Sequence, residues 1–162
     1  MADKHLATYL NDHLAGSAAA LEILEHLEAA HASTEMGRLG AGLRADVAAD
    51  RQELETLMAR LQVAQSRTRK AAGWVGEKAT ELKLRLDDRA GGELHLLEAL
   101  EALSLGIEGK KGLWQALGAA AADAPALQGL DYERLARRAE EQRQRVEGVR
   151  LEAARKALIP GP

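Results

Sequence analysis

Polar side chains interrupt the apolar stripes of four predicted helices, near the middle of each helix. Ser17 and Asp50 each lie seven residues from a leucine on either side. Seven residues make about two helical turns, so each shares a face with those leucines. Ser104 and Gln142 lie on or beside the corresponding stripes further along the chain. If the helices pack with their midpoints at one level, these four residues form a polar layer inside the core.

Such a layer can be structural or can do chemistry. An unpaired buried polar group costs about 1–3 kcal/mol, so partners are required. The structural interpretation is a hydrogen-bonded layer in which Asp50 pairs with Ser17, His13 or Gln142 and fixes the register of the helices. The chemical interpretation is a metal or cofactor site built from carboxylates and imidazole. The candidate metal ligands near that level are His13, Asp46, Asp50, Glu101 and Glu108.

Long helices must position these residues. The chain has three prolines, and the first is Pro125, so nothing interrupts helices before it. Apolar residues recur at three- and four-residue steps over about 3–31, 35–61, 93–123 and 132–159. Ser33 or Thr34 is the predicted N-cap of the second helix, and Asp131 is that of the last. The short link before residue 35 makes the first two helices antiparallel neighbours.

The segment of about 66–89 separates the second and third long helices. Ser66 or Thr68 opens a shorter helix there, and Gly91 and Gly92 end it. A connection of this length lets the second and third long helices run parallel. The segment is the only basic one, and an alternative interpretation is an amphipathic helix on a membrane surface. Interspersed acidic residues favour the crossover.

Composition indicates a single all-α domain over 1–162, with 159–162 as a tail. The 162 residues contain no cysteine and no phenylalanine, and the apolar content is mainly Ala and Leu, which favour helix over strand. The net charge of -3 argues against a broad nucleic-acid surface. We see neither a signal peptide nor an apolar run long enough to span a membrane, so we expect a cytoplasmic protein.

The layout resembles the ferritin-like superfamily. The segment from Tyr9 to Leu14, with the Ala-rich stretch after it, is similar to the first helix of small bacterial ferritin-like proteins of unassigned role. The resemblance implies an antiparallel four-helix bundle with a short fifth helix in the crossover between the second and third long helices. Members that bind two irons or manganese ions use Glu from two helices and Glu-x-x-His from the other two.

The ligand pattern of those members is not reproduced at the middle of this chain. The position expected to carry a ligand on the first helix is near Ser17, a poor ligand. On the last helix, the spacing of Glu-x-x-His is filled by Glu140 with Arg143 and by Glu147 with Arg150. An arginine there would repel a cation. The resemblance therefore implies a ferritin-like fold whose di-metal centre is largely lost.

These observations favour a non-enzymatic interaction or stress-associated protein, a homo-oligomer such as a dimer, without cofactor. The alternative is a carboxylate-rich protein that binds iron or manganese. A small-molecule ligand, if any, stays unidentified.

Four glycines on the third long helix form a separate signal. Gly106, Gly109, Gly112 and Gly118 each cost about 1 kcal/mol in a helix interior. They indicate close packing against the crossover or another subunit, or a ligand slot beside Trp114.

Overall fold

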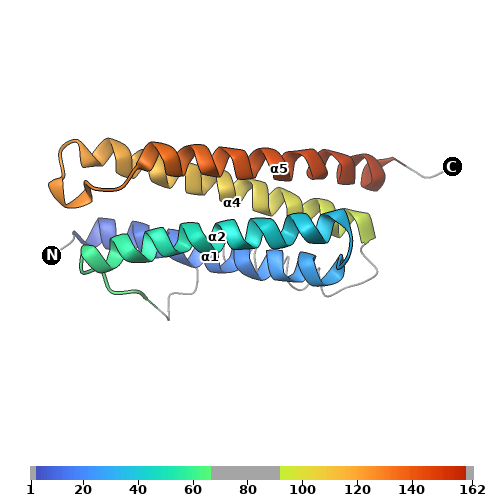
Figure 1. Ribbon diagram of the computed structural model, residues 1–162, viewed down its shortest axis with the longest axis horizontal. Coiled ribbons are helices and arrows are strands. Elements are labelled where there is room, and N and C mark those ends of the chain that lie inside the picture. Colours follow the sequence, from blue (N-terminus) through green and yellow to red (C-terminus); the bar gives the residue numbers. More distant parts are fainter. Residues whose placement is uncertain (1–2, 67–91, 160–162) are drawn as a thin grey trace.

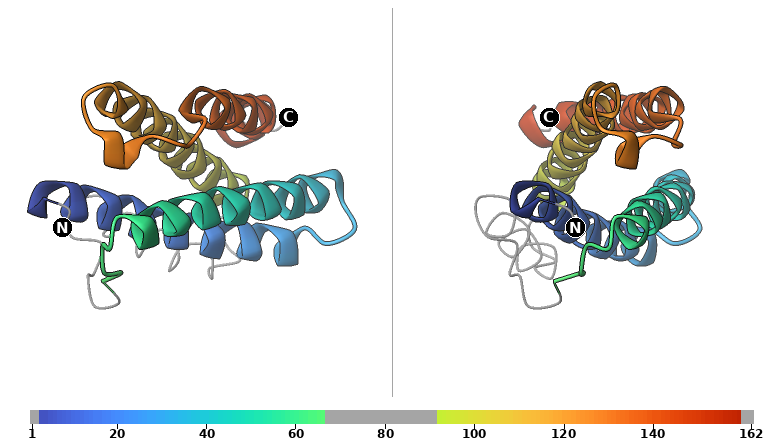
Figure 2. Two further views of the ribbon diagram at one scale, coloured as in Figure 1. Left: turned by 60° about the vertical axis from the view of Figure 1, so that its left-hand side comes forward. Right: turned by 90° about the vertical axis from the view of Figure 1, so that its left-hand side faces the viewer.

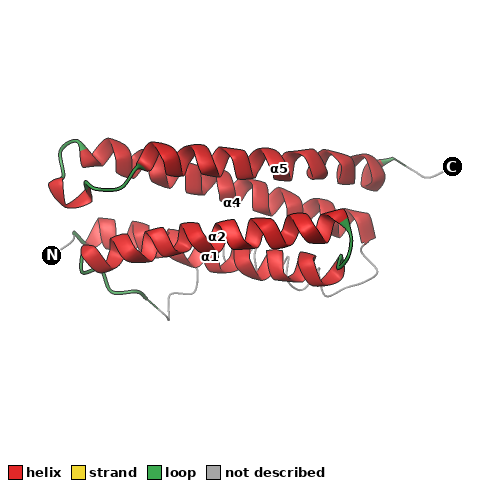
Figure 3. Cartoon of the chain, viewed as in Figure 1, coloured by secondary structure: helices red, strands yellow, loops and turns green. Residues whose placement is uncertain are grey.

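Four long helices make up most of the structure, a computed structural model that describes residues 3–66 and 92–159. They are α1 (Lys4–Ala30), α2 (Glu35–Arg60), α4 (Gly92–Ala121) and α5 (Tyr132–Leu158), with a short 3-10 helix, η2 (Pro125–Leu127), between the last two. The described residues form no strand (Figure 3). The all-α expectation is confirmed for this part of the chain. The predicted crossover helix and residues 160–162 of the tail lie outside the described residues.

The helix boundaries follow from capping residues at two of the predicted sites. Thr34 Oγ1 accepts a hydrogen bond of 3.2 Å from Gly37 N at the start of α2. Asp131 Oδ1 accepts one of 2.9 Å from Arg134 N at the start of α5. Each satisfies a backbone donor that the first helical turn leaves unpaired. Gly129, at φ +99°, makes the left-handed turn that leads into α5.

The helices form two antiparallel hairpins that pack against each other. α1 runs beside α2, and α4 runs beside α5 (Figure 1). The colours of Figure 1 show that α2 and α4 run in the same direction, as the long connection predicts. Figure 2 shows the α4/α5 layer lying across the α1/α2 layer, where α1 meets α4 and α2 meets α5. None of the described helices combines the length and apolar character needed to cross a membrane.

The apolar core consists of two clusters, one toward each end of the bundle. The gap between them falls at the same level on every long helix: between Leu14 and Ile23, Val47 and Leu54, Ile107 and Leu113, and Leu135 and Val146, where only Ala139 intervenes. The residues that fill this gap are therefore the ones that decide what the middle of the bundle can do.

Glycines allow close helix contacts in the α1/α2 hairpin. A Cβ on Gly37 would lie 2.2 Å from the His31 carbonyl oxygen, and one on Gly40 would lie 3.4 Å from Glu28 N. In α4, a close approach is found at Gly118, where a Cβ would lie 3.2 Å from Tyr132 Cβ of α5, and not against the predicted crossover or another subunit. At Gly106, Gly109 and Gly112, no described neighbour comes within 4 Å. The described helices therefore give no packing reason for those three.

Candidate functional site

Asp50 lies in the gap between the two apolar clusters. Its orientation on α2 is set by the apolar stripe of that helix, whose buried residues lie on the same face before and after Asp50. The side chain is only 2% exposed. A carboxylate so far from water is stable only with cations or several hydrogen-bond donors around it. The structure supplies both.

Lys110 of α4 is the first partner. Its Nζ lies 2.5 Å from Asp50 Oδ2, and it also donates to Gln142 Oε1. The Lys110 side chain is 14% exposed. Burial lowers the pKa of its ammonium group below the usual value, although the charge of Asp50 and its hydrogen bond act in the opposite direction. The ammonium group thus bridges two oxygens from two other helices.

Two residues of α5 complete the arrangement. Arg138 Nε donates to Asp50 Oδ1 over 2.7 Å, and a second guanidinium nitrogen of Arg138 contacts the same oxygen. Gln142, fully buried, donates from Nε2 to Asp50 Oδ2 over 2.9 Å. We call Asp50, Lys110, Arg138 and Gln142 the central polar cluster. It joins α2, α4 and α5 at one level.

The two serines predicted for this layer are not part of the central polar cluster. Ser17 Oγ donates to the Leu14 carbonyl of its own helix over 2.6 Å and accepts from Arg51 over 2.8 Å. Ser104 Oγ donates to Glu147 Oε1 over 2.6 Å. Of the four residues, the structure brings Asp50 and Gln142 into direct contact, and each serine instead meets a charged side chain.

Three of the metal-ligand candidates are carboxylates that pair with cationic side chains of α5 or α4. Asp46 pairs with Arg145. Glu101 lies 3.6 Å from Arg150, and both Glu101 and Glu108 are half exposed, so neither faces the core. The cationic partners of Glu108 are Lys111 at 2.9 Å and Arg143 at 3.2 Å.

His13 is held on α1 by contacts unrelated to the central polar cluster. Its ring meets the Tyr9 ring edge-on, with 4.7 Å between the ring centroids. Burial lowers the pKa of His13 despite the opposing charge of Asp12. The described residues contain no group of three or more His, Asp or Glu side chains placed to hold a metal ion. The five candidates are thus not brought together, because cations of the chain itself hold the carboxylates apart.

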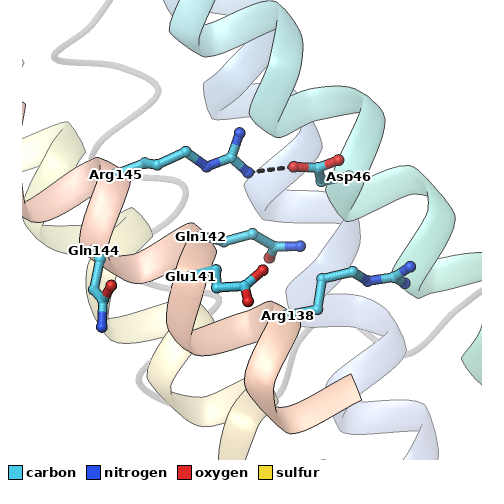
Figure 4. Close-up of a pocket in the computed structure, with 6 residues that line it drawn as sticks. All are labelled: Asp46, Arg138, Glu141, Gln142, Gln144 and Arg145. Atoms are coloured by element: carbon cyan, nitrogen blue, oxygen red, sulfur yellow. Dashed lines mark hydrogen bonds and ion pairs between the residues drawn. The ribbon is translucent and has the colours of Figure 1, made fainter. Parts of the chain in front are cut away.

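An open pocket of about 580 Å³ lies over the central polar cluster, between α2 and α5 (Figure 4). Its lining combines two carboxylates, two guanidinium groups and two amides: Asp46, Arg138, Glu141, Gln142, Gln144 and Arg145. Arg145 reaches across the pocket to Asp46 in Figure 4. The mixture of charges favours neither anions nor cations as ligands.

No protein-family model, curated protein or solved structure matches the chain. What the site can do must therefore be argued from its own geometry.

Sequence reasoning missed two members of the central polar cluster, Lys110 and Arg138. The alternating arginines and glutamates of 137–155 are typical of a solvated helix face, and that interpretation is wrong for Arg138, because its guanidinium group holds the buried carboxylate of Asp50. A signal was present in both cases. Lys110 follows Ile107 by three residues and precedes Trp114 by four, and Arg138 stands in the same relation to Leu135 and Gln142.

One Glu-x-x-His spacing does occur in the sequence. Glu28 and His31 have it, but they lie at the C-terminal end of α1. Glu28 pairs with Arg44 over 2.7 Å, and His31 is the helix cap. The pair is therefore well away from the middle of the bundle.

Trp114 offers no open slot for a ligand. Its side chain is 1% exposed and packs in the apolar cluster that contains Leu10, Leu57 and Tyr132. The chain's own side chains thus cover the indole ring.

Proposed function

We propose that this chain is a non-enzymatic bundle of the ferritin-like type that acts by associating with other proteins, in the first place with a second copy of itself. One observation supports the non-enzymatic role. Lys110 Nζ lies between Asp50 Oδ2 and Gln142 Oε1, in the middle of the bundle. Two oxygen ligands that could face a metal ion instead face an ammonium group.

The chemistry of the surrounding groups supports the same conclusion. A divalent ion beside Asp50 would meet the positive charges of both Lys110 and Arg138 at close range, and this repulsion is strong where water is excluded. Open coordination positions for oxygen or substrate would also require water-filled space, which Lys110 and Gln142 occupy. The cluster therefore has a structural role: its two cations compensate the buried charge of Asp50, and its contacts set the level at which α2, α4 and α5 meet.

Exposed leucines on α4 and α5 support association. Leu94, Leu105, Leu151 and Leu158 are between 48% and 67% exposed. Because α4 and α5 are antiparallel, the start of α4 and the end of α5 lie at the same end of the bundle (Figure 1), which brings Leu94 and Leu158 to that end. Large apolar side chains in water favour burial against a partner.

Two measurements test the absence of a metal centre and the self-association separately. Thermal unfolding in the presence of added Fe²⁺ or Mn²⁺ should give the midpoint found without metal, since only binding to the folded state raises it. Sedimentation should show a dimer that the double variant Leu94→Glu/Leu158→Glu converts to monomer. Tyr9→Ser, on α1, is the matched control and should leave the dimer intact. A monomeric wild type would overturn self-association, and a metal-dependent midpoint would overturn the structural role of the cluster.

A further inference from the structure

Three ion pairs line the seam between α2 and α5. Glu53 meets Arg134 over 3.2 Å, Asp50 meets Arg138, and Asp46 meets Arg145. The acids lie at positions 46, 50 and 53 of α2, on one helix face, and the arginines follow in the opposite order along α5. The chain directions explain this order, because α2 and α5 are antiparallel (Figure 1).

The two helices are spaced by these long side chains. On the α2 side of the seam, Gly42 presents no side chain, and the Arg145 guanidinium reaches to 3.9 Å from where its Cβ would be. The open pocket of Figure 4 lies along the same seam. Arginine side chains and their ion pairs thus line this open part of the boundary between α2 and α5.

The seams within the hairpins also carry ion pairs, such as Glu101 with Arg150, but there the helices come into close contact as well. In α1/α2, Gly40 brings the backbones close enough that a Cβ would lie 3.4 Å from Glu28 N. In α4/α5, Gly118 allows the same closeness to Tyr132. Separating either hairpin would break such contacts, whose dispersion and burial energy does not depend on salt. Separating α2 from α5 would break the three ion pairs, in addition to apolar contacts within the two clusters. Two of these pairs are exposed to solvent: Asp46 is 40% and Arg145 42% exposed, and Glu53 is 30% and Arg134 45% exposed. Salt weakens such pairs.

Directly behind this seam lies the central polar cluster. Gln142 is part of the pocket lining and bonds to Lys110 and Asp50, the two charges that are most shielded from water. If α2 and α5 part, water reaches these groups first. We propose that the α2/α5 seam is an ion-paired gate, which opens more readily than the seams within the two hairpins and whose open population rises with ionic strength. Opening exposes Lys110 to solvent. This inference concerns the single chain and stands independently of dimer formation.

The opening of the gate can be measured in the full-length protein by acylating lysine amines with an N-hydroxysuccinimide ester. Mass spectrometry then gives the labelling rate of each lysine. Lys110 should be labelled about two- to five-fold faster in ~1 M than in ~0.01 M sodium chloride, because the Debye length falls about tenfold. Lys156, which is 57% exposed on α5 and pairs with Glu152, reports the reagent and the effect of salt on an exposed lysine, so the rate of Lys110 is expressed relative to it.

Charge variants separate the gate from a general loss of stability. Asp46→Asn should speed Lys110 labelling at low salt, and the charge-swapped pair Asp46→Arg/Arg145→Asp should return it to the wild-type rate. Glu28→Gln, which removes a comparable exposed pair between α1 and α2, should leave Lys110 labelling unchanged. An equal Lys110 rate at both salt concentrations would overturn the proposal. So would an effect of Glu28→Gln as large as that of Asp46→Asn, since both would then act by loosening the whole bundle.

Discussion

Lys110 Nζ lies 2.5 Å from Asp50 Oδ2, so a lysine of α4 neutralises the buried carboxylate of α2. Arg138 and Gln142 of α5 bond to the same carboxylate. Three helices thus meet on one aspartate, which sits in the gap between the two apolar clusters. This relationship explains how a core with a charged middle can be stable, and most of the predictions below depend on it.

Replacing Asp50 should be the most damaging single change in the cluster. Asp50→Ala leaves Lys110 and Arg138 without their shared anion, and removing one partner of a buried ion pair typically costs about 3–5 kcal/mol. Chemical denaturation measures the loss in the free energy of unfolding. Asp46→Asn, which breaks an exposed pair one helical turn away, is the matched control and should cost less than about 1 kcal/mol. Equal losses in the free energy of unfolding would show that the buried Asp50 contributes no more to stability than the exposed Asp46.

The contact between Lys110 and Asp50 should appear as energetic coupling. Lys110→Met keeps the aliphatic stem and removes the charge, while Arg138 still neutralises Asp50, so the loss should be smaller than for Asp50→Ala. In a double-mutant cycle with Asp50→Asn, the two effects should fail to add by about 0.5–3 kcal/mol. Additive effects would mean that the two side chains do not interact in solution.

Stability should fall in acid partly through Glu147. Hydrogen bonds from Arg150 and then from Ser104 lower the pKa of this carboxylate from 4.5 to about 2 in the folded protein. A lowered pKa stabilises the fold above pH 4.5, and this contribution is lost as the pH falls toward 2. The stability advantage of wild type over Glu147→Gln should therefore shrink across that range, measured by denaturation at several pH values. Glu152→Gln, at a position 63% exposed, is the control and should show a smaller change. An advantage that stays constant down to pH 2 would contradict the assignment.

Two helix glycines should respond in opposite directions to the same substitution. Gly37→Ala places a Cβ 2.2 Å from the His31 carbonyl oxygen, so the α1/α2 turn must shift and the melting temperature should drop. Gly109→Ala fills open space on α4 and should stabilise by about 0.5–1 kcal/mol, because alanine loses less backbone entropy in a helix. Destabilisation by Gly109→Ala would mean that a neighbour beyond the described residues occupies that space.

The sequence predicts the four long helices closely because their signals are local. Apolar spacing, the N-caps Thr34 and Asp131, and the turn at Gly129 each act within a few residues. The common level of Asp50 and Gln142 also follows from the sequence, since helices of similar length that pack side by side over their whole length align their midpoints.

The partners of Asp50 were harder to predict. Lysine and arginine on a helix are usually solvated. The helical spacing of Lys110 from Ile107 and Trp114 is shared by Lys111, which lies four residues after the one and three before the other, yet pairs with Glu108 and Glu140 on the exposed edge of α4. The difference arises from helix rotation: Lys110 turns toward α2, whereas Lys111 turns toward α5. That rotation is set by packing between the hairpins, which is a property of the whole fold. The sequence therefore leaves a carboxylate-rich metal site open as an alternative, because it does not show that Lys110 and Arg138 contact Asp50.

Elemental analysis of the protein purified without chelators tests the central claim most directly. Because the ammonium group of Lys110 neutralises Asp50, the purified chain should carry iron and manganese far below one ion per chain, and Asp50→Asn should not change their content. One or more ions of iron or manganese per wild-type chain, lost in Asp50→Asn, would contradict the account, since the cation beside that aspartate would then be a metal.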